Sequence, residues 1–332
     1  MYKIITSICC STILLATSLS ANAETIIRLA HDSNETSPVH KAMVYFKDQI
    51  EERSEGDMIV EIYPARQLGG VRETTELVQQ GNLQMTFGAS VLLAPFVPEF
   101  NVLDIFYLFR DTDHAHRALD NPHIGNPLLQ AMETKGFHGL GFMESGFRSI
   151  TTNKHPINTM NDLKGLKIRA ASNPTQIAAW EAVGTAPTPL SWGEIFTSLQ
   201  QGLIDTQESA IYSVYAERFY EAQKYLSLTN HIYTNYVLFM NKPFWDELSA
   251  DQKKLINIVS AETMIKQRIL AEEQNKSVIK ELIEKGMIVN KVPQAVQEQM
   301  KEKMNAAVYD ELRKKTGPKL FDDIIIKINE LQ

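Results

Sequence analysis

The sequence TIIRLA-HDSNETS-PVHKAMVYFKDQIEER-SEGD-MIVEIY, residues 25–63, decides the fold because its hydrophobic period changes from strand to helix and back. Residues 25–30 and 58–63 are short apolar runs rich in β-branched side chains, which predict two strands. Between them, residues 38–53 carry apolar side chains at helical spacing, namely Val39, Met43, Phe46 and Ile50. The stretch therefore predicts a strand, a helix and a second strand in succession.

The same alternation continues and then recurs. A helix over residues 70–80, ended by Gly81, leads to a strand over 83–88. Later segments predict further strands and helices: strands over 138–144, 165–170 and 203–207, and helices over 174–183 and 191–201. The helix endings Leu77–Gly81 and Leu199–Gly202 are nearly alike. We therefore expect an α/β fold with two similar halves and a mostly parallel sheet.

The C-terminal part, from about residue 249 onward, is charged and amphipathic, which predicts a largely helical region. Residues 251–284 are long enough for one helix packed across both halves, with Ser249 as its N-cap. No low-complexity linker separates the halves, so we expect crossover strands to join them. Two lobes with a cleft between them commonly capture a ligand by hinge closure.

Residues 1–23 have the features of a signal peptide. An apolar stretch from Ile4 to about Leu19 is shorter than a comfortable bilayer span, and Ala21-Asn22-Ala23 fits the small-x-small cleavage pattern. A membrane anchor or a first core helix is the alternative. Cys9 and Cys10 are the only cysteines in the sequence. We expect an exported protein in the periplasm of a Gram-negative bacterium, with no disulfide in the mature chain.

The composition and the motifs argue against several classes of function. A net charge of −7 over 332 residues does not suit a nucleic-acid partner. The sequence has no Gly-x-Ser-x-Gly, P-loop, Gly-x-Gly-x-x-Gly or His-Glu-x-x-His motif. His114 and His116 are close, but two residues apart they do not share a helix face, so a locally bonded pair is favoured over a metal site. We expect no enzymatic activity, no cofactor and no metal.

Two arginines stand where an α/β fold places its ligands. Arg148 follows the end predicted for the strand over 138–144, and Arg169 lies at the C-terminal end of the strand over 165–170. Ligands of open α/β sheets bind beyond the carboxyl ends of the strands. A guanidinium there can hold a carboxylate through two parallel hydrogen bonds. A surface arginine or a salt bridge between strands is the alternative for each.

Four further residues are weaker candidates, each with an ordinary structural alternative. Glu73 lies in the first turn of a predicted helix, where an acidic residue simply complements the helix dipole. Trp192 precedes a helix and suits the core as well as a cleft wall. His31 and Asp32 follow the first strand, where a cleft would open, but a plain turn is the alternative.

An ordered series of motifs also resembles a known family, the substrate-binding proteins of tripartite ATP-independent periplasmic (TRAP) transporters. The resemblance covers essentially the whole chain after residue 23. The motifs are, in order, Ala30-His31-Asp32, Ser37-Pro38-Val39-His40, Gln67-Leu68-Gly69, Arg72-Glu73, Phe106–Asp111, Asp162–Arg169, Pro187-Thr188-Pro189, Ser191–Glu194, Leu199–Gly202 and Asp205-x-Gln207-Glu208.

The resemblance implies a two-lobed periplasmic binding fold with a ligand cleft between the lobes and a long bridging helix. Lobe I is expected over 24–145 plus about 235–274, and lobe II over 146–234 plus about 275–332. In this family, the arginine matching Arg169 grips the ligand carboxylate and the one matching Arg148 adds a second contact. Ser209 stands where the family usually has a ligand-binding asparagine, which changes the expected ligand geometry.

The resemblance also predicts the role. We expect a monomer that binds a small organic acid and delivers it to a TRAP permease made of a small and a large membrane subunit. The motifs look most like those of members that bind sugar acids such as uronates and aldonates. C4-dicarboxylates and keto acids remain open as ligands. A receptor that presents the acid to a sensor kinase, or a periplasmic enzyme acting on a sugar acid, are alternatives from other classes.

Overall fold

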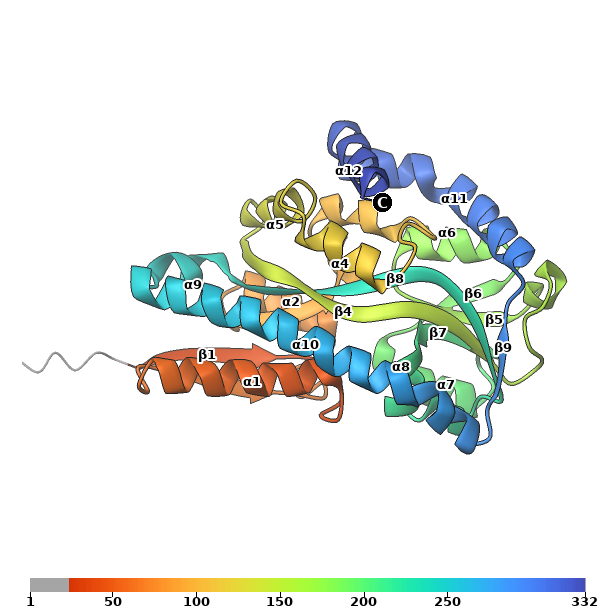
Figure 1. Ribbon diagram of the computed structural model, residues 1–332, viewed down its shortest axis with the longest axis horizontal. Coiled ribbons are helices and arrows are strands. Elements are labelled where there is room, and N and C mark those ends of the chain that lie inside the picture. The colour runs from red at the N-terminus through yellow and green to blue at the C-terminus, as the bar shows by residue number, and fades with distance from the viewer. Residues whose placement is uncertain (1–23, 332) are drawn as a thin grey trace, which may run out of the picture.

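The structure is a computed structural model that describes residues 24–331, so the predicted signal peptide lies outside the described residues. The first half alternates strands and helices as the sequence predicts (Figure 1): β1 (Thr25–Ala30), α1 (Pro38–Arg53), β2 (Met58–Tyr63), α2 (Val71–Gln79) and β3 (Met85–Ala89). Local chemistry sets the start of α1. The Ser37 side chain accepts a hydrogen bond from the His40 backbone N–H, and Pro38 occupies the first turn.

The second half repeats this order, with a 3-10 turn added: β5 (Lys167–Ala170), α6 (Pro174–Ala182), β6 (Ala186–Pro189), η3 (Trp192–Glu194), α7 (Ile195–Gln200) and β7 (Thr206–Ala210). In both halves the first strand lies between the other two, in the orders β2-β1-β3 and β6-β5-β7. The expectation of two similar halves is therefore confirmed. The strand predicted over 203–207 is shifted toward the C-terminus, because Gly202 to Asp205 form the turn into β7.

The centre of the sheet differs from the prediction. β4 (Phe137–Thr152) and β8 (Tyr225–Asn241) are long crossover strands, and the segment predicted as a strand over 138–144 is only part of β4. They pair antiparallel with each other, while β8 also pairs antiparallel with β3 and β4 with β7. The sheet order is β2-β1-β3-β8-β4-β7-β5-β6. Each half is parallel within itself, but the sheet as a whole is mixed.

The long helix is confirmed as α10 (Ala250–Glu284), with Ser249 as its N-cap and Gln252 completing a capping box. It contacts α1 on the first half, crosses β4, and reaches α8 (Ile211–Ala216) beside the second half. The Gln267 side chain fixes it to β4 at Glu144, accepting from the backbone N–H and donating to the carbonyl, both at 2.8 Å. Residue Gln267 is buried.

The remaining elements complete the layers around the sheet: α3 (Ser90–Leu93), η1 (Pro98–Asp104), α4 (Thr112–Asp120), α5 (Gly125–Glu133), η2 (Met160–Leu163), η4 (Phe219–Glu221), α9 (Lys242–Glu247), β9 (Ile288–Lys291), α11 (Gln294–Thr316) and α12 (Pro318–Glu330). β9 pairs with β8, a strand within the region expected to be largely helical. No helix within residues 24–331 has the length and apolar character to cross a membrane.

The two neighbouring histidines lie on α4 and serve different partners. The His114 ring nitrogens lie 3.2 Å from the Arg110 backbone N–H and 3.1 Å from the Ile328 carbonyl oxygen. His116 Nε2 lies 3.1 Å from the buried Glu144 carboxylate. Among the described residues, no three His, Cys, Asp or Glu side chains cluster as a metal site would require.

Candidate functional site

A cleft opens where the two halves face each other across the crossover strands. Its lining comes from segments after β1, β3, β5 and β7 and from the middle of β4 and β8. This is the carboxyl edge of the parallel strands, as the sequence predicts for a ligand site. The cleft holds about 880 Å³ of non-protein space, open solvent at its mouth included.

Arg169 is a buried cation in the cleft lining. Its side chain lines the cleft and the residue is only 3% exposed. Nε donates to the Leu190 carbonyl at 3.0 Å, and the guanidinium lies over the Trp192 ring, 5.8 Å from its centroid. Within residues 24–331, no carboxylate lies within 4.0 Å of this guanidinium. Burial lowers the pKa of Arg169 to about 10, so the group stays charged at neutral pH.

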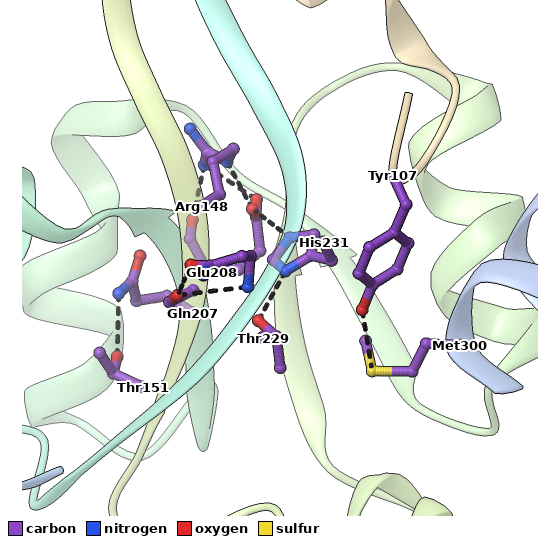
Figure 2. A network of polar contacts seen from close by, with 10 residues as sticks. Tyr107, Arg148, Thr151, Gln207, Glu208, Thr229, His231 and Met300 are labelled. Carbon is purple, nitrogen blue, oxygen red and sulfur yellow. Dashed lines mark hydrogen bonds and ion pairs between the residues drawn. The ribbon is translucent and has the colours of Figure 1, made fainter. Parts of the chain in front are cut away.

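Arg148 also lines the cleft, but it already has a partner (Figure 2). Its Nε donates to Glu208 Oε2 at 2.5 Å, and Nη2 donates to Glu208 Oε1 at 2.9 Å and to the Glu208 carbonyl at 2.6 Å. The salt bridge between strands, named above as the alternative for Arg148, is therefore present. It fixes the position of the Arg148 guanidinium through Nε and Nη2.

A buried histidine, His231, also contacts the Glu208 carboxylate of the Arg148–Glu208 pair. His231 Nε2 lies 3.1 Å from Glu208 Oε2, and its Nδ1 lies 2.8 Å from the Thr229 hydroxyl (Figure 2). Burial disfavours ionisation of Glu208, but the Arg148 charge and the hydrogen bonds from His231 and Arg148 outweigh it. The pKa of Glu208 is lowered to about 2, so the carboxylate is ionised and Arg148 is held in place.

Acidic groups occupy another part of the lining. Asp32 and Glu217 both line the cleft, and Arg66 lies beside them at the rim. Burial raises the pKa of Asp32 to about 6; the nearby Arg66 charge opposes the rise, and Glu217 adds to it. Near pH 7, Asp32 is mostly ionised, so it can accept hydrogen bonds from ligand hydroxyls.

Four of the predicted site residues lie in the cleft lining: Arg148, Arg169, Asp32 and Trp192. The other three lie outside it. His31 is buried, 3.1 Å from a ring nitrogen of His40, and stacks on Phe87. Glu73 is exposed and accepts from the Gly70 backbone N–H at 2.9 Å, so it caps α2, as its alternative explanation states.

Ser209 is the third. It is fully buried on β7, and its hydroxyl has no hydrogen-bond partner among the described residues. Side chains alternate across a strand, and the neighbouring Glu208 takes the position that faces the cleft. A ligand-binding role for Ser209 stays a prediction.

Sequence reasoning missed several polar residues of the lining. Glu208 appeared in a motif without a role. Tyr236 and Thr234 lie on β8, one of the crossover strands that were expected between the halves without assigned residues. Tyr236 and Tyr212 bring their hydroxyls within 3.2 Å of each other.

Comparisons with known proteins agree with this geometry. A family model described as bacterial extracellular solute-binding protein, family 7 (DctP) matches residues 29–315. The chain is 35% identical over 264 residues to the 2,3-diketo-L-gulonate-binding periplasmic protein YiaO of Escherichia coli (strain K12), covering 79% of this chain and 80% of that protein.

Two solved structures share the fold. One is the sugar acid binding protein DctPAm of Advenella mimigardefordensis in complex with galactonate, with a TM-score of 0.89, 29% identity and coverage of 93% of this chain and 99% of that chain. The other is a TRAP periplasmic solute-binding protein of Polaromonas sp. JS666 bound to D-erythronate, with a TM-score of 0.85, 33% identity and coverage of 91% and 98%.

These matches confirm the predicted two-lobed periplasmic binding fold, while the residue limits of the lobes stay a prediction. They also place the chain among proteins that bind substrates and do not transform them. The chain therefore belongs to family 7 of the bacterial extracellular solute-binding proteins, the DctP family of TRAP transporters.

Proposed function

We propose that this protein binds a sugar acid with one carboxylate, an aldonate or a uronate, and delivers it to a TRAP permease. One observation carries the proposal. Within residues 24–331, Arg169 is the one buried arginine whose guanidinium has no carboxylate within 4.0 Å. A buried charge without a partner is costly, and a ligand carboxylate would supply the partner.

The other charges of the cleft favour one ligand carboxylate over two. Arg148 is neutralised by Glu208, so Arg169 is the cation that remains for an anion. Asp32 and Glu217 would repel a second carboxylate on the ligand. A C4-dicarboxylate would meet this repulsion, whereas a polyhydroxylated acid with one carboxylate would not.

Hydroxyl groups of such an acid have partners in the lining. Asp32 and Glu217 are acceptors, and further polar side chains can donate or accept: Ser145, Gln176, Tyr212, Ser213, Thr234 and Tyr236. The names of the relatives support the same class. Galactonate and D-erythronate, bound in the two similar structures, are acids of this kind, and 2,3-diketo-L-gulonate is a related sugar acid.

Delivery to a permease is proposed from the family and not from a contact in the structure. Solute-binding proteins of TRAP transporters hand their ligand to a membrane partner, and this chain matches them over most of its length. We propose that the protein works as a periplasmic monomer. Loss of acid uptake on deletion of the protein, with restoration by the wild-type chain, is the result expected in cells.

A thermal-shift screen against small acids tests the ligand class. Because a ligand that binds only the folded state stabilises it, a true ligand at about 100 times its Kd should raise Tm by roughly 5 °C. The panel should hold aldonates, uronates, succinate and pyruvate. We expect the largest shift from an aldonate or a uronate. A shift from succinate or pyruvate alone would overturn the sugar-acid proposal while leaving a carboxylate ligand in place.

A further inference from the structure

Arg66 reaches across the mouth of the cleft from the first half to the second. It follows β2, and its Nη1 donates to the Asp32 carbonyl at 3.2 Å, within the first half. Its Nη2 lies 4.0 Å from Glu217 Oε2, just after α8 on the second half. The Arg66 side chain is 36% exposed and that of Glu217 17%, and Glu217 also lines the cleft.

A glycine on the second half makes room for the same side chain. A Cβ placed on Gly193 would lie 3.2 Å from both Cδ and Nε of Arg66, which is tighter than ordinary van der Waals contact. The arginine stem therefore lies directly over the backbone of η3, next to Trp192 of the cleft lining. Arg66 thus contacts the second half at two separate segments.

The backbone on both sides of this contact is held in an unfavourable conformation. Of the six non-glycine residues with positive φ among those described, three lie here: Ala65 (φ 50°), Arg66 (φ 67°) and Arg218 (φ 57°). The Ala65 and Arg66 N–H groups donate to the Ser33 and His31 carbonyls at 3.2 and 3.1 Å. Side chains with a Cβ disfavour this region, and such conformations concentrate at functional sites.

We propose that Arg66 and Glu217 form a latch between the halves that slows release of the bound acid. The inference rests on the proposed solute binding and adds a positioning pair to it. When the halves separate, the Arg66–Glu217 pair and the packing on Gly193 are lost, while the bond to the Asp32 carbonyl stays within the first half. The latch therefore stabilises only the closed state, so its loss should change dissociation more than association.

Release kinetics test the latch with D-galactonate as the ligand. We expect Arg66→Ala to release it about three- to tenfold faster, with an association rate within about twofold of wild type. Arg66→Glu should release it faster still, because two carboxylates then face each other. The exchange Arg66→Glu with Glu217→Arg is tested by the ligand-free distance measurement below, because Glu217 also lines the cleft and its replacement would change ligand binding itself. Arg313→Ala is the matched control, since it removes an ion pair between α11 and α12 whose arginine side chain is 41% exposed, close to the 36% of Arg66.

A second measurement reports closure without depending on ligand identity. Residues 24–332 contain no cysteine, so spin labels on Lys41→Cys of α1 and Lys164→Cys before β5 report the distance between the halves. We expect Arg66→Ala to lose part of the compact population and the charge exchange to restore it. Identical distance distributions and release rates in wild type and Arg66→Ala would overturn the latch.

The two measurements also separate the two proposals. If the wild-type protein binds none of the acids, the proposed ligand class fails, and the ligand-free distance distributions alone decide the latch. In that case a compact population that Arg66→Ala loses would support the latch, and identical ligand-free distributions would overturn it.

Discussion

At the scale of single residues, Arg148 and Arg169 have different partners, although both were predicted to bind a ligand carboxylate. Arg148 is committed to Glu208 by three hydrogen bonds, whereas Arg169 donates to one backbone carbonyl. Only Arg169 stands at a strand end, because β4 continues past the end predicted at residue 144 and Arg148 lies within it. The predicted position at a strand end nevertheless pointed to both residues. It did not reveal the difference, because the partner Glu208 lies on β7, 60 residues from Arg148 along the chain.

This difference predicts opposite effects of two alanine substitutions. Arg169→Ala should weaken binding of a sugar acid by at least about 100-fold, because the ligand carboxylate loses its charged partner. The Tm of the ligand-free protein should stay the same or rise, since a buried charge without a carboxylate partner is removed. Calorimetry and thermal unfolding of the folded variant measure both quantities.

Arg148→Ala is the matched comparison. It leaves the buried Glu208 carboxylate without its cation, so it should lower the free energy of unfolding by about 3 kcal/mol while binding stays measurable. If Arg148→Ala abolished binding and Arg169→Ala did not, the assignment of the carboxylate to Arg169 would be wrong.

At the scale of elements, helices with a clear N-cap residue were predicted with nearly correct limits, and an irregular strand was not. Ser37 and Ser249 cap α1 and α10 as ordinary N-cap residues, and both helices have nearly the predicted limits. The crossover strand β4 was predicted only over residues 138–144 of its full length, because its register shifts at Gly139–Gly141, Glu144–Gly146 and Arg148–Ile150. Such irregularities break the alternation of side chains on which a strand is recognised from sequence.

The irregularity at Glu144 is where α10 is attached, which gives a prediction for Gln267. Gln267→Ala removes two buried hydrogen bonds to the Glu144 backbone, and it should lower the free energy of unfolding by about 2–4 kcal/mol. Lys266→Ala, exposed on the same helix, is the control and should change it by less than about 0.5 kcal/mol. Urea unfolding measures both, and equal effects would contradict a specific role for the attachment.

At the scale of the whole molecule, the sequence predicts two α/β halves and the helix that spans them. It does not predict the antiparallel centre of the sheet, since β3, β4, β7 and β8 pair across long separations in the chain. The residues of the candidate site could likewise be predicted only in part from the sequence. Asp32 after β1 and Arg169 at the end of β5 were found from local sequence, while the lining residues on β8 and after α8 depend on how the halves meet.

The central claim is that the cleft holds one ligand carboxylate on Arg169 and hydroxyls elsewhere, and three matched ligands test it most directly. Galactitol, D-galactonate and galactarate share a six-carbon polyhydroxylated chain and carry no, one and two carboxylates. Calorimetric titration of the wild-type protein should show binding of galactonate, no measurable binding of galactitol, and binding of galactarate at least about tenfold weaker because Asp32 and Glu217 repel its second carboxylate. Binding of galactitol as tight as that of galactonate, or tighter binding of galactarate, would contradict the account.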